Sequence, residues 1–222
     1  MSQTLNVGYA ASSLILLTFF VAALALQLSA KTCRPLLYWA VIVATSTAGT
    51  TVSDYMDRSL ALGYAEVSLI LVTLLLAIFA VWRFSTGSVS VDNIKTKRVE
   101  LFYWTTILFS NTLSMALGDY LADSSGLGFV GGAALSGGLL ALLVAAHFLT
   151  KLSGVLLFWV AFVLTRPFGA TFGDLLTKPS SKRGLDLGTA GSSMVLASAL
   201  AILVIHAMVI AAHTRQYANL VK

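Results

Sequence analysis

Seven long apolar stretches, each separated from the next by a short polar break, restrict this chain more than any other feature of its sequence. They lie at about 8–30, 36–57, 63–83, 101–121, 127–149, 154–175 and 187–212. At about 1.5 Å per residue, each is long enough to cross the ~30 Å hydrocarbon core of a bilayer as a helix. Only 10% of the residues are charged, whereas soluble domains carry about 25%. The sequence therefore predicts an all-α integral membrane protein of about seven transmembrane helices, with residues 1–222 as a single transmembrane domain.

The basic residues lie in the short connections, so membrane topology accounts for the net charge of +5 without nucleic acid as a partner. One set of loops holds nine of them: Lys31, Arg34, Arg83, Lys95, Lys97, Arg98, Lys151, Arg215 and Lys222. The opposite set holds four: Arg58, Lys178, Lys182 and Arg183. Because cytoplasmic loops are enriched in Lys and Arg, we expect the N-terminus outside and the C-terminus inside. The lipid bilayer is the expected partner, and a homo-oligomer stays open.

A tryptophan and an aspartate recur at a fixed spacing along the chain. Trp39, Trp104 and Trp159 are each followed fifteen residues later by an aspartate, at Asp54, Asp119 and Asp174. The unit is two helices: a polar helix that ends in Asp, and then an apolar helix opened by Leu-Gly. Two helices return the chain to the same side of the membrane, so successive units run parallel. The predicted repeats are about 35–98, 99–152 and 153–222.

Residues 1–34 match only the second half of this unit, because Gly8-Tyr9 corresponds to Gly63-Tyr64. Two explanations stay open. The protein has three and a half repeats, or Met1 is an internal methionine and a full first repeat brings a fourth aspartate. We favour the longer protein, because a half repeat leaves one side of the axis unlined, although a second copy in a dimer could cover that side.

The repeat resembles the tandem repeat of unknown function in the bacterial "uncharacterised membrane-anchored protein" family. The matching motifs are Ser53-Asp54 with Leu62-Gly63-Tyr64, Gly118-Asp119 with Leu127-Gly128-Phe129, and Gly173-Asp174 with Leu187-Gly188. The third departs at the aromatic position, where Thr189 stands. The resemblance covers essentially the whole chain. It implies tandem helical hairpins, here expected in a bacterial cytoplasmic membrane, and it brings no established reaction.

The three aspartates are the best candidates for a site. In parallel repeats Asp54, Asp119 and Asp174 lie at one depth near the outer surface. Three such carboxylates repel one another unless a cation joins them or one stays protonated. We therefore predict a cation site with these three as metal ligands. The other interpretation stays open: they are interfacial residues solvated by headgroup water, or N-caps of short outer helices.

Further candidates share a helix face or a repeat position with the aspartates. Thr47, Thr51, Thr112 and Met115 are spaced to lie on the aspartate faces of their helices. Asn111 and Arg166 occupy the same repeat position, where the preceding repeat has Ser46. Arg166 is the one basic residue well inside a span, and we expect it to be an internal counter-ion. It either pins Asp174 or Glu66, or replaces a departing cation.

The function expected from these features is a transporter or channel for cations, with a divalent metal such as manganese as the leading substrate. The polar second, fourth and sixth helices would surround the path. Two alternatives stay open: a membrane enzyme acting on a lipid or isoprenoid substrate, and a structural partner protein. No nucleotide-binding, zinc-protease or hydrolase motif is present. We therefore expect no catalytic residue and no bound cofactor, with the metal ion itself as substrate.

Overall fold

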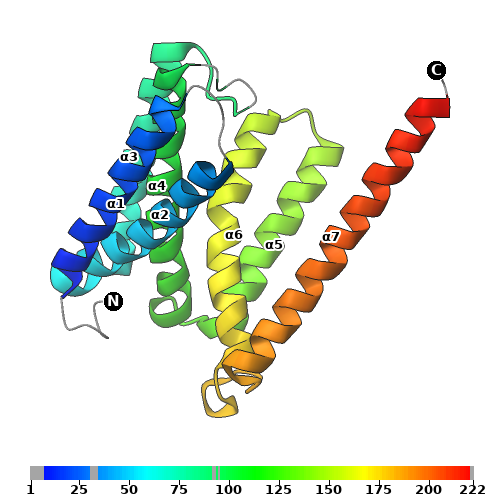
Figure 1. Cartoon of the computed structure of the whole chain (residues 1–222). Coiled ribbons are helices and arrows are strands. Elements are labelled where there is room, and N and C mark those ends of the chain that lie inside the picture. The colour runs from blue at the N-terminus through cyan, green and yellow to red at the C-terminus, as the bar shows by residue number, and fades with distance from the viewer. Residues whose placement is uncertain (1–7, 31–34, 92–93, 95, 221–222) are drawn as a thin grey trace. The chain divides into compact units, whose positions relative to one another are not determined.

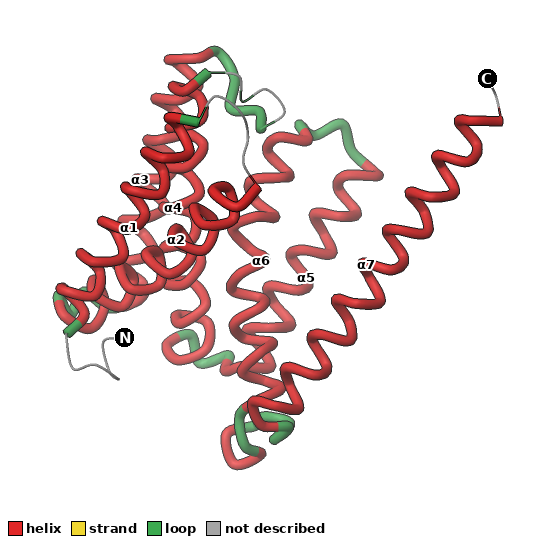
Figure 2. The backbone as a smooth tube through the Cα atoms, in the orientation of Figure 1, coloured by secondary structure: helices red, strands yellow, loops and turns green. Residues whose placement is uncertain are grey.

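The structure is a computed structural model that describes residues 8–30, 35–91, 94 and 96–220, and these form helices joined by short connections (Figure 1, Figure 2). The helices are α1 (Tyr9–Ser29), α2 (Pro35–Asp54), α3 (Tyr64–Thr86), α4 (Lys97–Asp119), α5 (Gly128–Leu149), α6 (Gly154–Thr177) and α7 (Gly188–Leu220). The predicted all-α class and the predicted seven helices are therefore confirmed.

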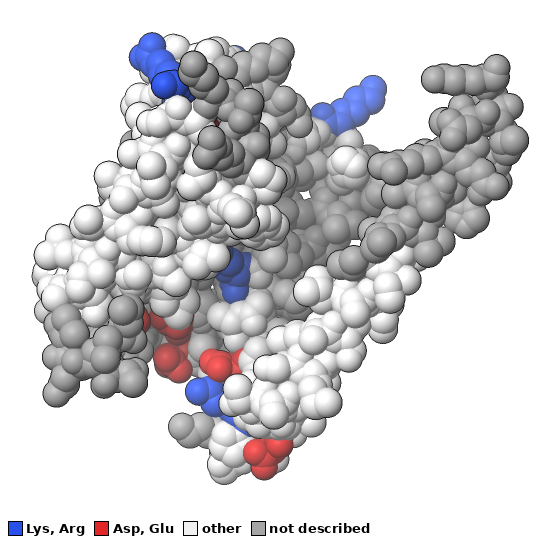
Figure 3. Space-filling view, in the orientation of Figure 1, with Lys and Arg blue, Asp and Glu red and all other residues white. Residues whose placement is uncertain are grey.

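Five of these helices are long and apolar enough to cross a membrane: α1, α2 with its following turn, α3, α5 and α6. The described apolar part of α7 runs from Gly188 to Leu203. On the face drawn in Figure 3, most of the surface along the helices is uncharged. These features together indicate an integral membrane protein.

The fourth helix extends beyond the apolar stretch that the sequence places at about 101–121. The helix begins four residues earlier, at Lys97, because the Thr96 side chain accepts a hydrogen bond from the Val99 backbone N–H. Glu100 in the first turn then interacts favourably with the positive end of the helix dipole. The charged residues from Lys97 to Glu100 precede the apolar stretch, so the sequence placed them in a loop. In the structure they form the first turn of α4.

The glycine at the start of the apolar helix has a positive φ in every repeat. Gly63 immediately precedes α3 with φ at 83°, a value that side chains with a Cβ rarely adopt. The equivalent glycines, at 8, 128 and 188, have φ values of 77°, 63° and 63°. The motif therefore turns the chain sharply from the connection into the apolar helix. The half repeat uses the same turn at Gly8, whereas residues 1–7 lie outside the described residues.

The residue contacts divide the chain into two compact units, residues up to Thr171 and residues from Phe172. In the first unit α2 and α4 run in the same direction and pack against each other (Figure 1). The apolar helices lie on the outside, α1 against α2 and α3 against α4. In the second unit, the end of α6 is joined to the start of α7 by a hydrogen bond from Thr177 Oγ1 to Ser192 Oγ at 3.1 Å. The polar helices α2 and α4 are thus the inner pair of the first unit.

Candidate functional site

Buried polar side chains follow the contact between α2 and α4, and we call this feature the polar seam. Its members are Thr45 and Ser53 of α2 and Ser110, Asn111, Thr112 and Ser114 of α4, each at most 3% exposed. Hydroxyl and amide groups are costly in hydrocarbon, where they lose their solvation. In a membrane protein they are therefore placed toward other helices rather than toward lipid. The seam is therefore a polar part of the protein interior of this unit.

A glycine allows the two helices of the seam to approach closely. A Cβ placed on Gly49 would lie 3.0 Å from the Cβ of Asn111 and 3.1 Å from the backbone nitrogen of Thr112. Gly49 belongs to a buried stripe at helical spacing, with Val41, Ala44 and Ala48. Small residues of this kind are typical of helix contacts inside membranes. The close approach brings the backbone of α2 onto the Asn111 side of α4.

Helix α6 joins the seam through two hydrogen bonds. The Arg166 guanidinium donates from Nη1 to Ser46 Oγ at 3.1 Å. Ser114 Oγ donates to the Val163 backbone carbonyl at 2.8 Å. Ser46 and Arg166 are equivalent positions of the first and third repeats, so the repeat brings the same position of different helices together. Asn111, the equivalent residue of the second repeat, packs against Gly49, less than one turn beyond Ser46 along α2.

Several seam atoms have no hydrogen-bond partner among the described residues. These are the hydroxyl oxygens of Ser53 and Ser110 and the amide oxygen Oδ1 of Asn111. Leaving a buried polar group unsatisfied costs about 1–3 kcal/mol, so most buried polar groups are paired. The contact between α2 and α4 therefore holds three polar atoms that are open to a further hydrogen-bond partner.

Arg166 brings an uncompensated charge to the seam. It is half-buried, and within the described part of the chain its hydrogen-bond partner is the neutral Ser46, with no carboxylate in ion-pair range. A charged side chain near the middle of a membrane costs about 2.5–3.5 kcal/mol on insertion scales, and such residues normally face a partner or a wet cavity. The positive charge therefore makes this part of the seam a functional candidate.

The aspartates of the first two repeats lie at equivalent helix ends. Asp54 ends α2 and Asp119 ends α4, and each is followed by a five-residue π-helical turn, η1 (Tyr55–Ser59) and η2 (Tyr120–Ser124). The turns bring one more acid each, Asp57 and Asp123. Neither Asp54 nor Asp119 caps its turn through the side chain, so the N-cap interpretation of these two residues is wrong. π-helical turns are rare and recur at functional sites.

The third aspartate has a different environment. Asp174 lies within α6, and its carboxylate oxygen Oδ1 is 3.8 Å from Lys178 Nζ, one turn further along. Both side chains are about 40% exposed, so this ion pair contributes little stability. Among the described residues, no group of three or more His, Cys, Asp or Glu side chains is close enough to hold a metal ion. Asp174 belongs to the second unit, and the convergence of the three aspartates stays a prediction.

The other predicted candidates divide between buried and open positions. Asn111 and Thr112 are buried in the seam, and Met115 of α4 is half-buried. Thr47 is exposed and Thr51 half-buried, and each hydroxyl donates to a carbonyl of its own helix, Thr47 at 2.9 Å and Thr51 at 3.1 Å. The buried stripe of α2 therefore lies on another face than the one that the aspartate spacing indicated. The repeat position of Ser46, rather than that spacing, is the signal that finds the seam.

The opposite end of the seam is closed by aromatic side chains. The cluster comprises Tyr38, Phe79, Trp82, Phe102, Tyr103, Trp104 and Trp159. Beneath it, Glu100 Oε1 accepts hydrogen bonds from Gln27 Nε2 at 3.3 Å and from Trp104 Nε1 at 3.4 Å. The sequence did not predict this partly buried carboxylate, because Glu100 lies before the apolar stretch expected to form the fourth helix. We call this the basic end, because Arg83, Lys97, Arg98 and Lys151 lie here.

The fold and the seam together define a helical membrane protein of tandem two-helix repeats, in which the polar helices α2 and α4 of the first two full repeats form the inner pair of the first unit. The chain belongs to the Repeat of Unknown Function (DUF347) family, whose sequence model matches it at residues 37–88, 102–153 and 157–212. Each match begins one residue before an aromatic pair, at Tyr38-Trp39, Tyr103-Trp104 and Phe158-Trp159. The predicted family is thereby confirmed. No curated protein and no solved structure gives a match to the chain.

Proposed function

We propose that this protein is a transporter or channel that moves a small ion across the membrane along the polar seam. The observation that carries the proposal is the meeting of equivalent repeat positions: Arg166 donates to Ser46, and Asn111, with its unsatisfied Oδ1, packs against Gly49 of the same helix. Polar and charged groups within spans are costly, and they mark ion and solute pathways more often than structural contacts. The apolar helices α1 and α3 would then separate this path from lipid.

Cations are the solute class that we propose first, with a divalent metal such as manganese as the leading substrate. The support is electrostatic: four acids, Asp54, Asp57, Asp119 and Asp123, lie in or directly after the C-terminal ends of the two seam helices. A mouth lined by acids raises the local concentration of cations. The hydroxyl and amide oxygens deeper in the seam are suitable ligands for a partly dehydrated cation. In this proposal the Arg166 guanidinium donates its hydrogen bond to Ser46 when no cation is bound in the seam.

Anions are the second candidate class, and one specific observation favours them. Arg166 has no carboxylate partner among the described residues, so a bound anion would neutralise a charge that the protein leaves uncompensated. The Ser46 hydroxyl would add a hydrogen-bond donor. The two classes make opposite predictions for the same variants.

Ion flux into proteoliposomes tests the proposal. Purified protein is reconstituted with an interior dye that reports Mn²⁺ entry, and separately with one that reports chloride. For a cation path, Asp54→Asn and Asp119→Asn lower Mn²⁺ entry at least about fivefold, the effect of ~1 kcal/mol. For an anion path, Arg166→Gln abolishes chloride entry and the aspartate variants leave it unchanged. Thr165→Ala is the matched control, because Thr165 is exposed and bonds its own helix at Ala161.

The absence of flux for both ions would contradict the proposal. The remaining alternatives would then be the membrane enzyme on a lipid or isoprenoid substrate, which predicts turnover without a gradient, and the structural partner, which predicts co-purification of another subunit.

The orientation with the N-terminus outside and the C-terminus inside also stays a proposal. It rests on the nine-to-four distribution of basic residues, of which Lys31, Arg34, Lys95 and Lys222 lie outside the described residues. A cysteine at Ser90, in the connection between α3 and α4, tests it. If an impermeant reagent added outside intact cells labels the Ser90→Cys variant, the proposed orientation is wrong and the opposite one holds.

A further inference from the structure

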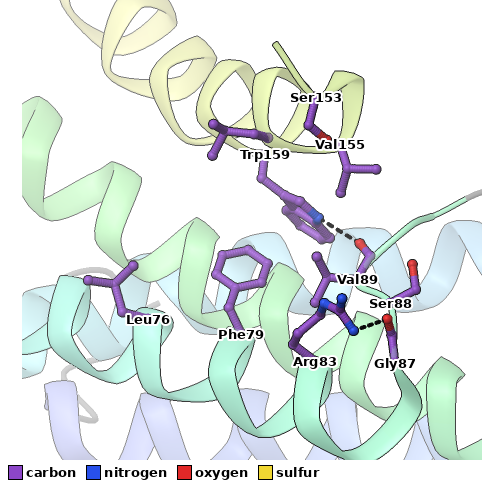
Figure 4. A pocket seen from close by; sticks show the side chains of 10 residues that line it. Leu76, Phe79, Arg83, Gly87, Ser88, Val89, Ser153, Val155 and Trp159 are labelled. Atoms are coloured by element: carbon purple, nitrogen blue, oxygen red, sulfur yellow. Dashed lines mark hydrogen bonds between the residues drawn. The ribbon is translucent and has the colours of Figure 1, made fainter.

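A half-open pocket of about 420 Å³ lies at the basic end of the first unit, between the last turns of α3 and the first turns of α6 (Figure 4). Its walls are apolar along their length and are formed by Leu76, Phe79, Val155, Leu156 and Trp159. The mouth is polar and is formed by Arg83, Ser88 and Ser153. The volume is in the range of small-molecule sites, about 300–1,000 Å³.

The two sides of the mouth are held in place by hydrogen bonds. The Arg83 guanidinium donates from Nη1 to the carbonyl of Gly87, the residue directly after α3 (Figure 4). Across the pocket, Trp159 Nε1 donates to the Val89 carbonyl at 3.2 Å. Arg83 uses one of its five N–H groups in this contact, which leaves others for a ligand. The arginine is thus fixed at the mouth before any ligand binds.

The shape and polarity of the pocket suit an amphiphile rather than a free anion. Leu76 lies seven residues before Arg83 on α3, so the apolar wall extends about 10 Å from the charge into the membrane at ~1.5 Å per residue. A free anion would use only the mouth, whereas a lipid would place its phosphate at Arg83 and an acyl chain along the wall. Basic pockets between helices on the cytoplasmic side bind anionic headgroups in the same manner.

We propose that this pocket is a binding site for an anionic phospholipid of the leaflet at the basic end. The phosphate binds Arg83 and the hydroxyl groups at the mouth, and one acyl chain packs on Phe79, Leu156 and Trp159. The lipid proposal does not rest on the proposed ion path. The acyl chain nevertheless packs on Trp159 and Phe79, which belong to the aromatic cluster that closes the seam. The membrane orientation decides only which leaflet supplies the lipid.

Lipid retention by the purified full chain tests this site. Native mass spectrometry compares binding of phosphatidylglycerol and phosphatidylcholine with the same acyl chains. We expect the wild-type protein to retain phosphatidylglycerol preferentially, and Arg83→Gln to lower that preference about fivefold. Arg83→Lys keeps the charge and should keep most of the preference. Lys151→Gln removes one charge from the same end without touching the pocket and should bind as the wild type does.

Leu76→Trp fills the apolar wall without changing any charge, and it should lower the retention of both lipids. The Leu76 side chain is 62% exposed, so the larger tryptophan should not disturb folding. The proposal is overturned if the wild type shows no preference, or if Arg83→Gln and Lys151→Gln reduce it equally. The first result would mean no headgroup site, and the second would mean a bulk charge effect.

Discussion

Helices α3 and α4 are neighbours of equal length, yet they are opposite in composition and in burial. Of the 23 residues of α3 only five are buried, although it is the most apolar of the candidate spans. Of the 23 residues of α4 ten are buried, although its polar content leaves it outside the five helices that are apolar enough to cross a membrane. In a soluble protein the apolar helix would lie inside. In a bilayer, apolar side chains can face the lipid without cost, so the inner helix is the more polar one.

The largest expected effect compares one repeat position in two environments. Trp104 of α4 is 1% exposed within the aromatic cluster, whereas Trp39 of α2 is 63% exposed. Trp104→Ala should lower the free energy of unfolding in micelles by about 3 kcal/mol, because it leaves a cavity. Trp39→Ala should lower it by less than about 1 kcal/mol, since only a lipid-facing anchor is lost. Equal losses at both positions would show that repeat position, not burial, determines their contribution.

The second prediction compares two glycines, one in α2 and one in α5. Gly49 faces Asn111 with no room for a Cβ, whereas a Cβ on Gly138 of α5 would meet nothing within 4 Å. We expect Gly49→Val to reduce the free energy of unfolding by about 1–3 kcal/mol through overpacking. For Gly138→Val the change should stay within about 0.5 kcal/mol. The α2–α4 contact would have to be looser than described if both variants melted like the wild type.

The third prediction separates stability from function within the seam. Asn111→Leu replaces a buried, unsatisfied amide by an apolar group of similar size. Because the native residue leaves Oδ1 without a partner, the variant should be as stable as the wild type or more stable by about 1 kcal/mol. Ion flux should nevertheless fall at least about tenfold, the loss of ~1.4 kcal/mol of interaction.

Thr73→Leu on α3 is the matched control, because Thr73 is exposed and its hydroxyl bonds only its own helix, at Leu69. It should leave both flux and stability unchanged. A strong loss of stability in Asn111→Leu would instead assign the amide a structural role.

The sequence predicted the helices and the repeats well, because both depend on local patterns. Runs of about twenty apolar residues define spans, and the Leu-Gly motif marks the turn that Gly63 makes. The equivalence of Ser46, Asn111 and Arg166 was also visible as a spacing. What that spacing meant was not visible, because a repeat shows that positions correspond and not what surrounds them.

The candidate site was predicted only in part for the same reason. Thr47 and Thr51 shared the face of Asp54 in the sequence, yet the contact with α4 runs along the stripe that contains Gly49. Helix–helix packing selects that stripe, and a single sequence does not record the partner helix. Glu100 was missed because Thr96 extends α4 by a turn beyond the apolar run.

The central claim is that the seam between α2, α4 and α6 is reached by water and ions. The most direct test is the reaction of single cysteines with a charged, membrane-impermeant thiol reagent in a Cys33→Ser background. The account predicts that Ser46→Cys and Asn111→Cys react, and that the lipid-facing Thr73→Cys does not. Unreactive cysteines at both seam positions, or equal reaction at Thr73, would contradict it.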